Sequence, residues 1–257
     1  MNWQFAQTPQ VFGAVHLCLV AVILAVNAVL RRFIRRLSEK DALRRLLACG
    51  LIMIAAEIWK QWFIRAYVYP GVKSMWFFPW QLCSMAMYLS VLAPFLKEKF
   101  QNACLVFLCT YSLLAAVFAL AVPSDMMRPQ VWFLLHGFVY HSLMITEAML
   151  AARILRGRPA ARFLPATALF FALAAVAEAV NVYGHYAVED ISHQPNMFFI
   201  TPYYPSTQVI FCDIAARFGI AAEVILYLAL IVAGSALLWK VSRAFAGRGE
   251  RPQGRPR

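Results

Sequence analysis

A cysteine and a histidine, each a few residues inside an apolar segment, are the residues best suited to do chemistry in this sequence. Cys83 lies in the run PWQLCS (79–84), seven residues inward from Trp76, and His136 lies five inward from Val131. A cysteine attacks carbonyl groups as its thiolate, and a nearby imidazole can take up the thiol proton. We therefore expect Cys83 to be a nucleophile and His136 its general base.

His141 is the alternative base. It lies five residues after His136, so on a helix it points about 140° away and sits deeper. His136 shares a face with Tyr140 and precedes Gly137, where another backbone or an acyl chain can come close, and we prefer it. Lone buried histidines are also commonly satisfied core residues, so this assignment depends on the pairing with Cys83.

Further polar residues fall at a similar depth in other apolar segments. Lys60 and Gln61 share one helical face with Glu57, and Asn181 follows Glu178 by three residues. At ~1.5 Å per residue these groups and the Cys83–His136 pair fall roughly 5–12 Å below the outer surface. The layer is either part of a site or a hydrogen-bonded plug between helices, with Glu57 and Lys60 as an ion pair.

Composition places the chain among multi-pass membrane proteins. Hydrophobic residues make up 62% of it and charged residues 14%, with a mean hydropathy of +0.64. The net charge of +12 is concentrated in short loops between apolar segments, which is typical of membrane topology and argues against nucleic-acid binding. The cysteines have neither CxxC nor Cys/His metal spacing, so we expect no metal and no cofactor.

The apolar segments predict a single all-α bundle of seven transmembrane helices within residues 1–245. Lys and Arg concentrate after the first, third, fifth and seventh segments, which predicts an outer N-terminus and an inner C-terminus. Residues 246–257 are rich in Gly, Pro and Arg and are expected to be a disordered basic tail. The predicted spans are about 11–30, 46–64, 76–96, 103–122, 131–152, 163–183 and 218–239.

The outer loop 184–216 is the longest connection and is expected to cover the mouth of the bundle as a lid. Its central part contains three prolines and several aromatic residues, so it cannot form one regular helix. Ordered loops of this length are usually functional. Asn196, Tyr203 and Tyr204 are its candidate substrate contacts.

Three short motifs together resemble the YwaF-like integral membrane family, which includes transmembrane protein 164 of eukaryotes. They are the run PWQLCS (79–84), the LHG triplet (135–137) and NMFF (196–199). The resemblance implies a membrane enzyme that moves fatty acyl groups between lipids through a cysteine thioester on Cys83, with His136 as base. The family usually has a histidine two residues before this cysteine, where this chain has Gln81.

Two functions follow as expectations. The first is an acyltransferase or acyl-lipid hydrolase of the cell membrane, with membrane lipids as donor and acceptor and with Gln81 or Asn181 steadying the oxyanion. The second is a non-enzymatic binding or transport protein whose polar cavity is lined by Glu57, Lys60, His136 and Glu178.

Overall fold

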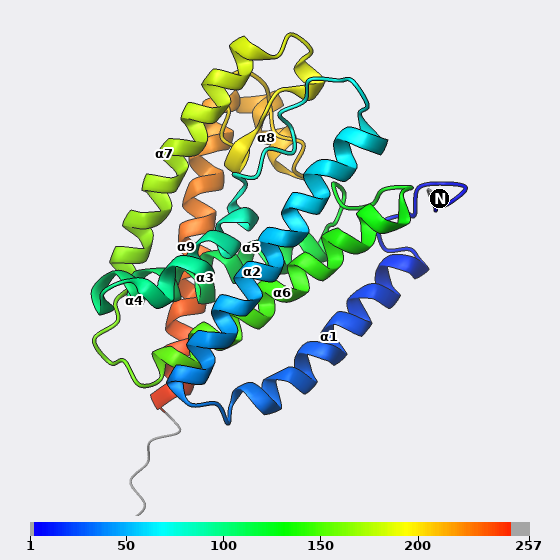
Figure 1. Ribbon diagram of the computed structural model, residues 1–257. Helices are drawn as coiled ribbons and strands as arrows, with labels where there is room; N and C mark the ends of the chain where they lie inside the picture. Colours follow the sequence, from blue (N-terminus) through cyan, green and yellow to red (C-terminus); the bar gives the residue numbers. More distant parts are fainter. Residues whose placement is uncertain (1–2, 248–257) are drawn as a thin grey trace, which may run out of the picture.

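The computed structural model describes residues 3–247, and the chain in this range is almost entirely helical. Figure 1 shows long helices packed side by side, with α1 at one edge of the bundle beside α6. The long helices are α1 (Ala14–Ile34), α2 (Glu39–Phe63), α6 (Val131–Leu155), α7 (Phe163–Ala187) and α9 (Ile220–Gly247). The shorter ones are α3 (Met85–Leu92), α4 (Glu98–Phe107), α5 (Leu113–Ala121) and α8 (Phe211–Phe218).

Five helical stretches of the described chain are long and apolar enough to cross a membrane. They are Ala14–Ile34, Glu98–Ala121, Val131–Leu155, Phe163–Ala187 and Ile220–Ala244. Helix α2 has the length but carries several charges, and the third apolar helix, Leu82–Phe95, is shorter. The all-helical membrane architecture is therefore confirmed, while the count of seven spans and the orientation of the termini stay predictions.

The predicted span 76–96 is wrong in its first part. Residues 72–81 are not helical, and the helix begins only at Leu82. Pro79 explains the late start, because proline lacks a backbone N–H and disfavours helical geometry in the residue before it. The 14 residues of Leu82–Phe95 rise only ~21 Å, short of the ~30 Å hydrocarbon core.

The loop that is expected to act as a lid is shorter than the range 184–216, because helices extend into both of its ends, and its covering role stays a prediction. Helix α7 continues to Ala187 and α8 begins at Phe211, so the lid comprises residues 188–210. At the C-terminus, α9 continues through residues 246 and 247, which were expected to belong to the tail. The rest of the predicted disordered tail lies outside the described residues.

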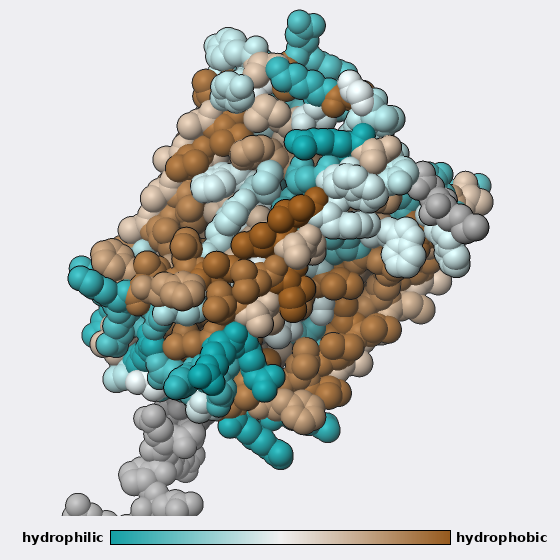
Figure 2. All heavy atoms as spheres, viewed as in Figure 1, coloured by the Kyte–Doolittle hydropathy of each residue, from teal (hydrophilic) through white to brown (hydrophobic). Residues whose placement is uncertain are grey.

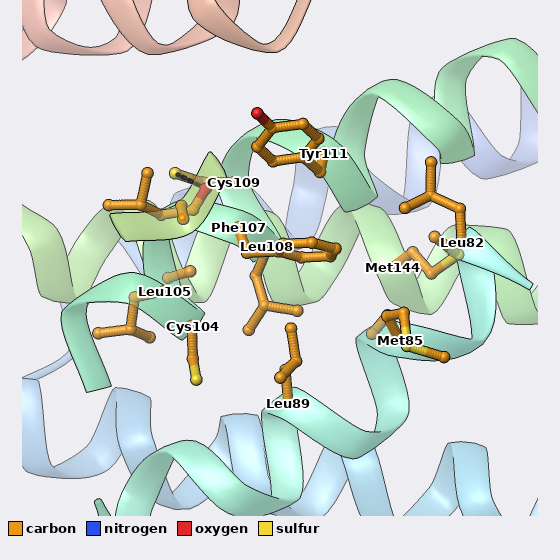
Figure 3. Close-up of a cluster of buried hydrophobic side chains, with 14 of the residues drawn as sticks. Leu82, Met85, Leu89, Cys104, Leu105, Phe107, Leu108, Cys109, Tyr111 and Met144 are labelled. Atoms are coloured by element: carbon orange, nitrogen blue, oxygen red, sulfur yellow. Dashed lines mark hydrogen bonds between the residues drawn. The ribbon is translucent and has the colours of Figure 1, made fainter. Parts of the chain in front are cut away.

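The core of the bundle is centred on the junction of α4 and α5 (Figure 3). Here Leu108–Ser112 form a π-helical turn between the two helices. The fully buried Tyr111 stacks against Phe170, with ring centroids 4.7 Å apart, and against Phe163. A π turn within an α-helix is often found near functional sites.

The surface in Figure 2 agrees with a membrane location. Hydrophobic side chains cover much of the middle of the visible face, and hydrophilic side chains gather toward its two ends. One end carries the connections after α1 and α6 and the C-terminal part of α9, and is called the basic end below. The lid lies at the opposite end (Figure 1).

Candidate functional site

Cys83 lies at the point where the irregular segment 72–81 turns into a helix. Gln81 has extended backbone angles, and Leu82–Ser84 form a 3₁₀ turn that leads into α3. The Tyr88 hydroxyl donates to the carbonyl of Pro79 at 2.9 Å and so fixes this entry from one turn inside the helix. The thiol is partly buried and packs against the main core.

The start of this helix leaves backbone donors beside the sulfur. The Ser84 N–H donates to the Gln81 carbonyl at 2.8 Å. Within the described chain, the N–H groups of Leu82 and Cys83 have no hydrogen-bond acceptor. Free N–H groups and the helix dipole at a helix start both favour negative charge, including a thiolate or an oxyanion.

Both candidate histidines bond to backbone carbonyls, which determines the tautomer of each neutral ring. The Nε2 atom of His136 lies 3.1 Å from the Ala56 carbonyl oxygen, and Nδ1 of His141 lies 2.7 Å from that of Gly137. Because a carbonyl oxygen only accepts, these nitrogens carry the protons. The lone pairs on His136 Nδ1 and His141 Nε2 are thus available as bases, and the latter is buried with no partner in the described chain.

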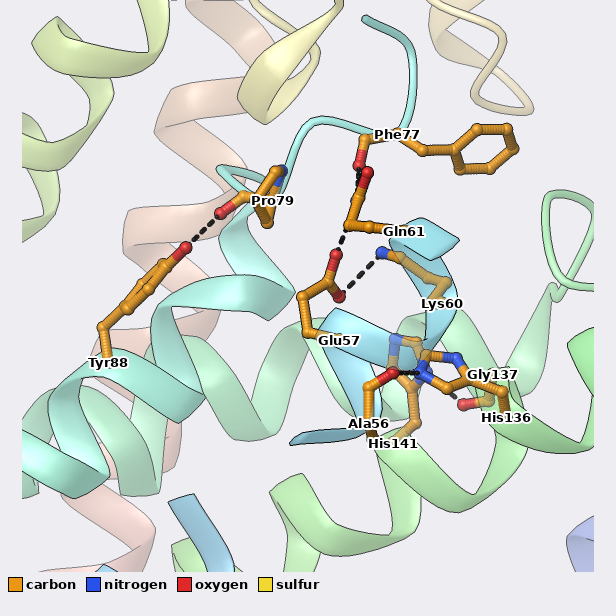
Figure 4. Close-up of polar contacts among 10 residues, drawn as sticks. All are labelled: Ala56, Glu57, Lys60, Gln61, Phe77, Pro79, Tyr88, His136, Gly137 and His141. Carbon is orange, nitrogen blue, oxygen red and sulfur yellow. Dashed lines mark hydrogen bonds and ion pairs between the residues drawn. The ribbon is translucent and has the colours of Figure 1, made fainter. Parts of the chain in front are cut away.

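The structure brings the α2 polar residues together as a buried ion pair (Figure 4). The Nζ atom of Lys60 lies 2.8 Å from Oε2 of Glu57, and both side chains are largely buried. The Gln61 Nε2 donates to Glu57 Oε1 and to the Phe77 carbonyl, each at 2.7 Å. The ion-pair interpretation of Glu57 and Lys60 is therefore correct, and Gln61 ties the pair to the irregular segment.

Lys60 lies in the same region as the two candidate bases (Figure 4). In the described chain, however, the Cys83 thiol forms no hydrogen bond with either imidazole, and His136 instead stacks between Trp59 and Tyr140. The expected nucleophile and base are thus not paired in this conformation.

Gln81 and Asn181 hold the lid. Gln81 Nε2 donates to the Asn196 carbonyl and its Oε1 accepts from the Phe198 N–H, both at 2.9 Å. The Asn181 side chain bonds in the same two-way manner to the backbone of Met197, at 2.6 and 3.1 Å, and also donates to Glu178. In this conformation both side chains are bonded to the lid, and their expected action as oxyanion donors stays a prediction.

The three candidate lid residues also make bonds within or beside the lid. Asn196 Oδ1 accepts from the Thr201 N–H, and the Tyr204 hydroxyl donates to the Pro195 carbonyl. Tyr203 stacks face to face on His185, with ring centroids 3.7 Å apart. Burial raises the pKa of the Tyr204 phenol to about 12, so this hydroxyl stays protonated at neutral pH.

A buried acid that the sequence analysis passed over lies deeper in the bundle. Glu147 on α6 is fully buried, and neither carboxyl oxygen has a hydrogen-bond partner in the described chain. The Ser90 hydroxyl of α3 lies beside it without reaching hydrogen-bond geometry. An acidic residue in the middle of an apolar segment is a signal in itself; it was missed because only residues near the outer surface were compared.

A small polar cavity lies at the C-terminal end of α2. Its volume is about 160 Å³, and Gln61, Arg65, Lys73, Ser74 and Phe77 are among its lining residues. Two cationic side chains in a cavity are suited to an anionic group such as a phosphate. Through Gln61 this cavity connects to the Glu57–Lys60 ion pair.

Comparison with known proteins identifies the family of the chain. The family model described as the TMEM164 family matches residues 11–212, which include all three motifs. Searches of curated proteins and of solved structures gave no match. The match supports the expected relationship to transmembrane protein 164 and a multi-pass membrane location. The chain belongs to the TMEM164 family.

Proposed function

We propose that the protein is a membrane-embedded acyltransferase or acyl-lipid hydrolase that works through a thioester on Cys83. The observation that carries the proposal is the position of Cys83 in the first turn of a helix, two residues after the Gln81 side chain that holds the lid. This position gives the sulfur nearby free N–H groups, an apolar surrounding and a covering loop. A nucleophile beside oxyanion donors in a site that excludes water is suited to acyl transfer.

The reaction follows from these groups. The Cys83 sulfur attacks the ester carbonyl carbon of an acyl lipid, a C–S bond forms, and the negative oxygen is stabilised by the N–H groups of Leu82 and Cys83. The ester C–O bond then breaks, and the leaving alkoxide takes the proton that His136 accepted from the thiol. A lipid hydroxyl or water next attacks the thioester carbon and gives its proton to His136. The C–S bond then breaks, and the departing sulfur takes that proton back, which restores the thiol.

The cavity at the end of α2 is suited to the headgroup of this lipid. Arg65 and Lys73 offer positive charge to a phosphate, and Phe77 lies between the cavity and the segment that leads to Cys83. A headgroup bound there would leave the acyl chains beside the apolar residues that surround Cys83. The proposed substrates are thus membrane phospholipids, and no cofactor takes part in the steps.

The unpaired thiol and imidazole are consistent with a resting state. Catalytic hydrogen bonds are often long or absent before substrate binds and tighten in the complex. The mechanism requires a conformational change in which His136 leaves the Ala56 carbonyl and its ring reaches the sulfur. His141, with its buried free nitrogen, is the competing base.

Mass spectrometry of the purified protein tests the proposal. We expect a fatty acyl mass on Cys83 that hydroxylamine removes, that is absent in Cys83→Ala, and that persists in Cys49→Ala, a control of similar exposure. His136→Ala and His141→Ala are then compared, and the histidine whose loss prevents formation of the adduct is the base. No adduct, together with no reaction of Cys83 with lipid-soluble alkylating probes, would refute the thioester mechanism.

The second candidate is a binding or transport protein, and the observation that favours it is Glu147. A protonatable group without partners in an apolar core is costly unless it serves a purpose, and intramembrane carboxyls often bind protons or ions. Under this function, Glu147→Gln abolishes pH-dependent uptake or binding in proteoliposomes while Cys83→Ala leaves it intact. Under the acyltransferase function, Cys83→Ala abolishes formation of the acyl adduct while Glu147→Gln leaves it intact.

A further inference from the structure

A second cavity lies at the basic end, between the C-terminal parts of α1, α6 and α9 and the π turn at 108–112. Its volume is about 200 Å³. In the same measure one water molecule needs only ~10–15 Å³, so a much larger group fits. Five arginines contribute to the lining: Arg31, Arg35, Arg153, Arg156 and Arg243.

The rest of the lining is mainly apolar. Met149 and Leu155 come from α6, Cys109 from the π turn, and Trp239 from α9. The guanidinium of Arg243 lies over the Trp239 ring, 5.5 Å from its centroid. The cavity therefore combines a cluster of positive charges with an apolar wall. A fully hydrated ion would suit the charged part but not the apolar wall.

Within the described residues, the five guanidinium groups have no protein counter-charge, and none of them takes part in an ion pair or a side-chain hydrogen bond. Two acidic groups at this end have other partners, since Glu39 pairs with Arg158 and Asp41 with Arg44. Partial burial lowers the pKa of Arg156, and the charges of Arg35, Arg153 and Arg31 lower it further. Mutual repulsion of this kind is relieved when an anion binds.

Arg158 shows how an arginine at the same end is satisfied when its function is structural. It contacts the Glu39 carboxylate and donates to Asn102 Oδ1 at 2.8 Å, which joins α2 to α4. Arg162 likewise donates to the carbonyls of Pro159 and Ala161. The cavity arginines make no such bonds to helix carbonyls, so capping of the helix ends does not explain them.

We propose that this cavity binds one anionic glycerophospholipid from the adjacent leaflet. The phosphate would lie among the arginines, whose planar groups bind phosphate oxygens in pairs, and one acyl chain would lie along Met149, Leu155 and Trp239. Basic cavities between transmembrane helices are suited to such headgroups. The site lies at the opposite end of the bundle from the lid and is independent of the proposed chemistry at Cys83.

Thermal unfolding in nanodiscs tests the proposal. The full chain is compared in phosphatidylcholine alone and with phosphatidylglycerol added, for the native sequence, Arg153→Gln/Arg156→Gln, and the control Arg32→Gln/Arg36→Gln. The control removes the same charge from exposed positions at the same end that do not line the cavity. We expect phosphatidylglycerol to raise the melting temperature of the native and control proteins but not of the cavity variant.

Native mass spectrometry in detergent supplies the stoichiometry. We expect one retained phosphatidylglycerol per chain and an affinity at least about tenfold lower in the cavity variant, equal to a loss of ~1.4 kcal/mol. If that variant does not fold, Arg35→Gln/Arg243→Gln removes two other arginines of the same cavity. An equal loss in the control pair would overturn the proposal in favour of general surface attraction. Stabilisation by inorganic phosphate alone to the same extent would overturn it in favour of a simple anion site.

Discussion

Gln81 and Phe198 are joined by a hydrogen bond of 2.9 Å from the Phe198 N–H to the Gln81 side-chain oxygen, while the Gln81 nitrogen donates to Asn196. A side-chain amide has a donor and an acceptor side by side, so it can bond at once to a backbone carbonyl and to a nearby backbone N–H. Phe198 and Phe199 both have positive φ angles, so this part of the lid is strained and needs such support. Gln81 thus connects the Cys83 turn directly to the lid.

Replacing Gln81 by Ala should loosen the lid while leaving the bundle folded. Two buried backbone groups lose their partners, at a cost of about 1–3 kcal/mol each. We expect faster amide hydrogen exchange at residues 196–200 and little change in α6. Gln208→Ala is the control, since the side chain of Gln208 makes no hydrogen bond in the described chain. Unchanged exchange in Gln81→Ala would show that the clamp does not hold the lid.

Gly184 provides a second test of lid closure. A β-carbon added to Gly184 would lie only 2.2 Å from Cγ of Pro195, so any larger residue must displace the lid from α7. Overpacking of this kind costs about 1–3 kcal/mol. We expect Gly184→Ala to increase proteolysis within residues 188–210, whereas Gly157→Ala, whose nearest neighbours lie at 3.6 Å or more, should not. Normal protection in Gly184→Ala would mean that Pro195 moves without opening the lid.

The all-helical membrane architecture could be inferred from hydrophobic patterning, but the irregular entry to the third apolar helix could not. Aromatic residues at 76–80 have the hydropathy of a span, and the sequence analysis gave Pro79 too little weight. The irregular segment is stabilised by side-chain hydrogen bonds of Gln61, Tyr88 and Gln81 instead of by the backbone hydrogen bonds of a helix. Bonds between residues so far apart in sequence cannot be inferred from local periodicity.

Some contacts of the candidate site could also be predicted from the sequence, and others could not. The Glu57–Lys60 pair was predictable, because residues three apart on a helix face each other. The partners of Gln81 and Asn181 were not, because they lie in a loop whose path has no sequence period. Depth estimates placed Cys83 near His136, but the direction of each side chain depends on rotamers and on neighbours such as Trp59.

Removing one member of the Glu57–Lys60 pair should be more harmful than removing both. Lys60→Met leaves a buried carboxylate without its counter-charge, which costs about 3–5 kcal/mol, while Glu57→Met/Lys60→Met leaves no buried charge. We expect the double variant to unfold at a higher temperature than Lys60→Met. Arg44→Met, which breaks the exposed pair with Asp41, should change stability by less than about 1 kcal/mol. If the double variant loses as much stability as the two single variants together, the two charges act independently.

The orientation of the chain can be tested with two introduced thiols at opposite ends. Glu189 lies in the lid and Lys40 at the basic end, and both are exposed. In a background where the exposed thiols are removed by Cys18→Ser/Cys212→Ser, each of Glu189→Cys and Lys40→Cys is treated with a membrane-impermeant maleimide on intact cells. Because basic loops stay on the cytoplasmic side, we expect Glu189→Cys to react at once and Lys40→Cys only after permeabilisation. The reverse pattern would place the lid and Cys83 toward the cytoplasm, and the lipid for acyl transfer would then come from the inner leaflet.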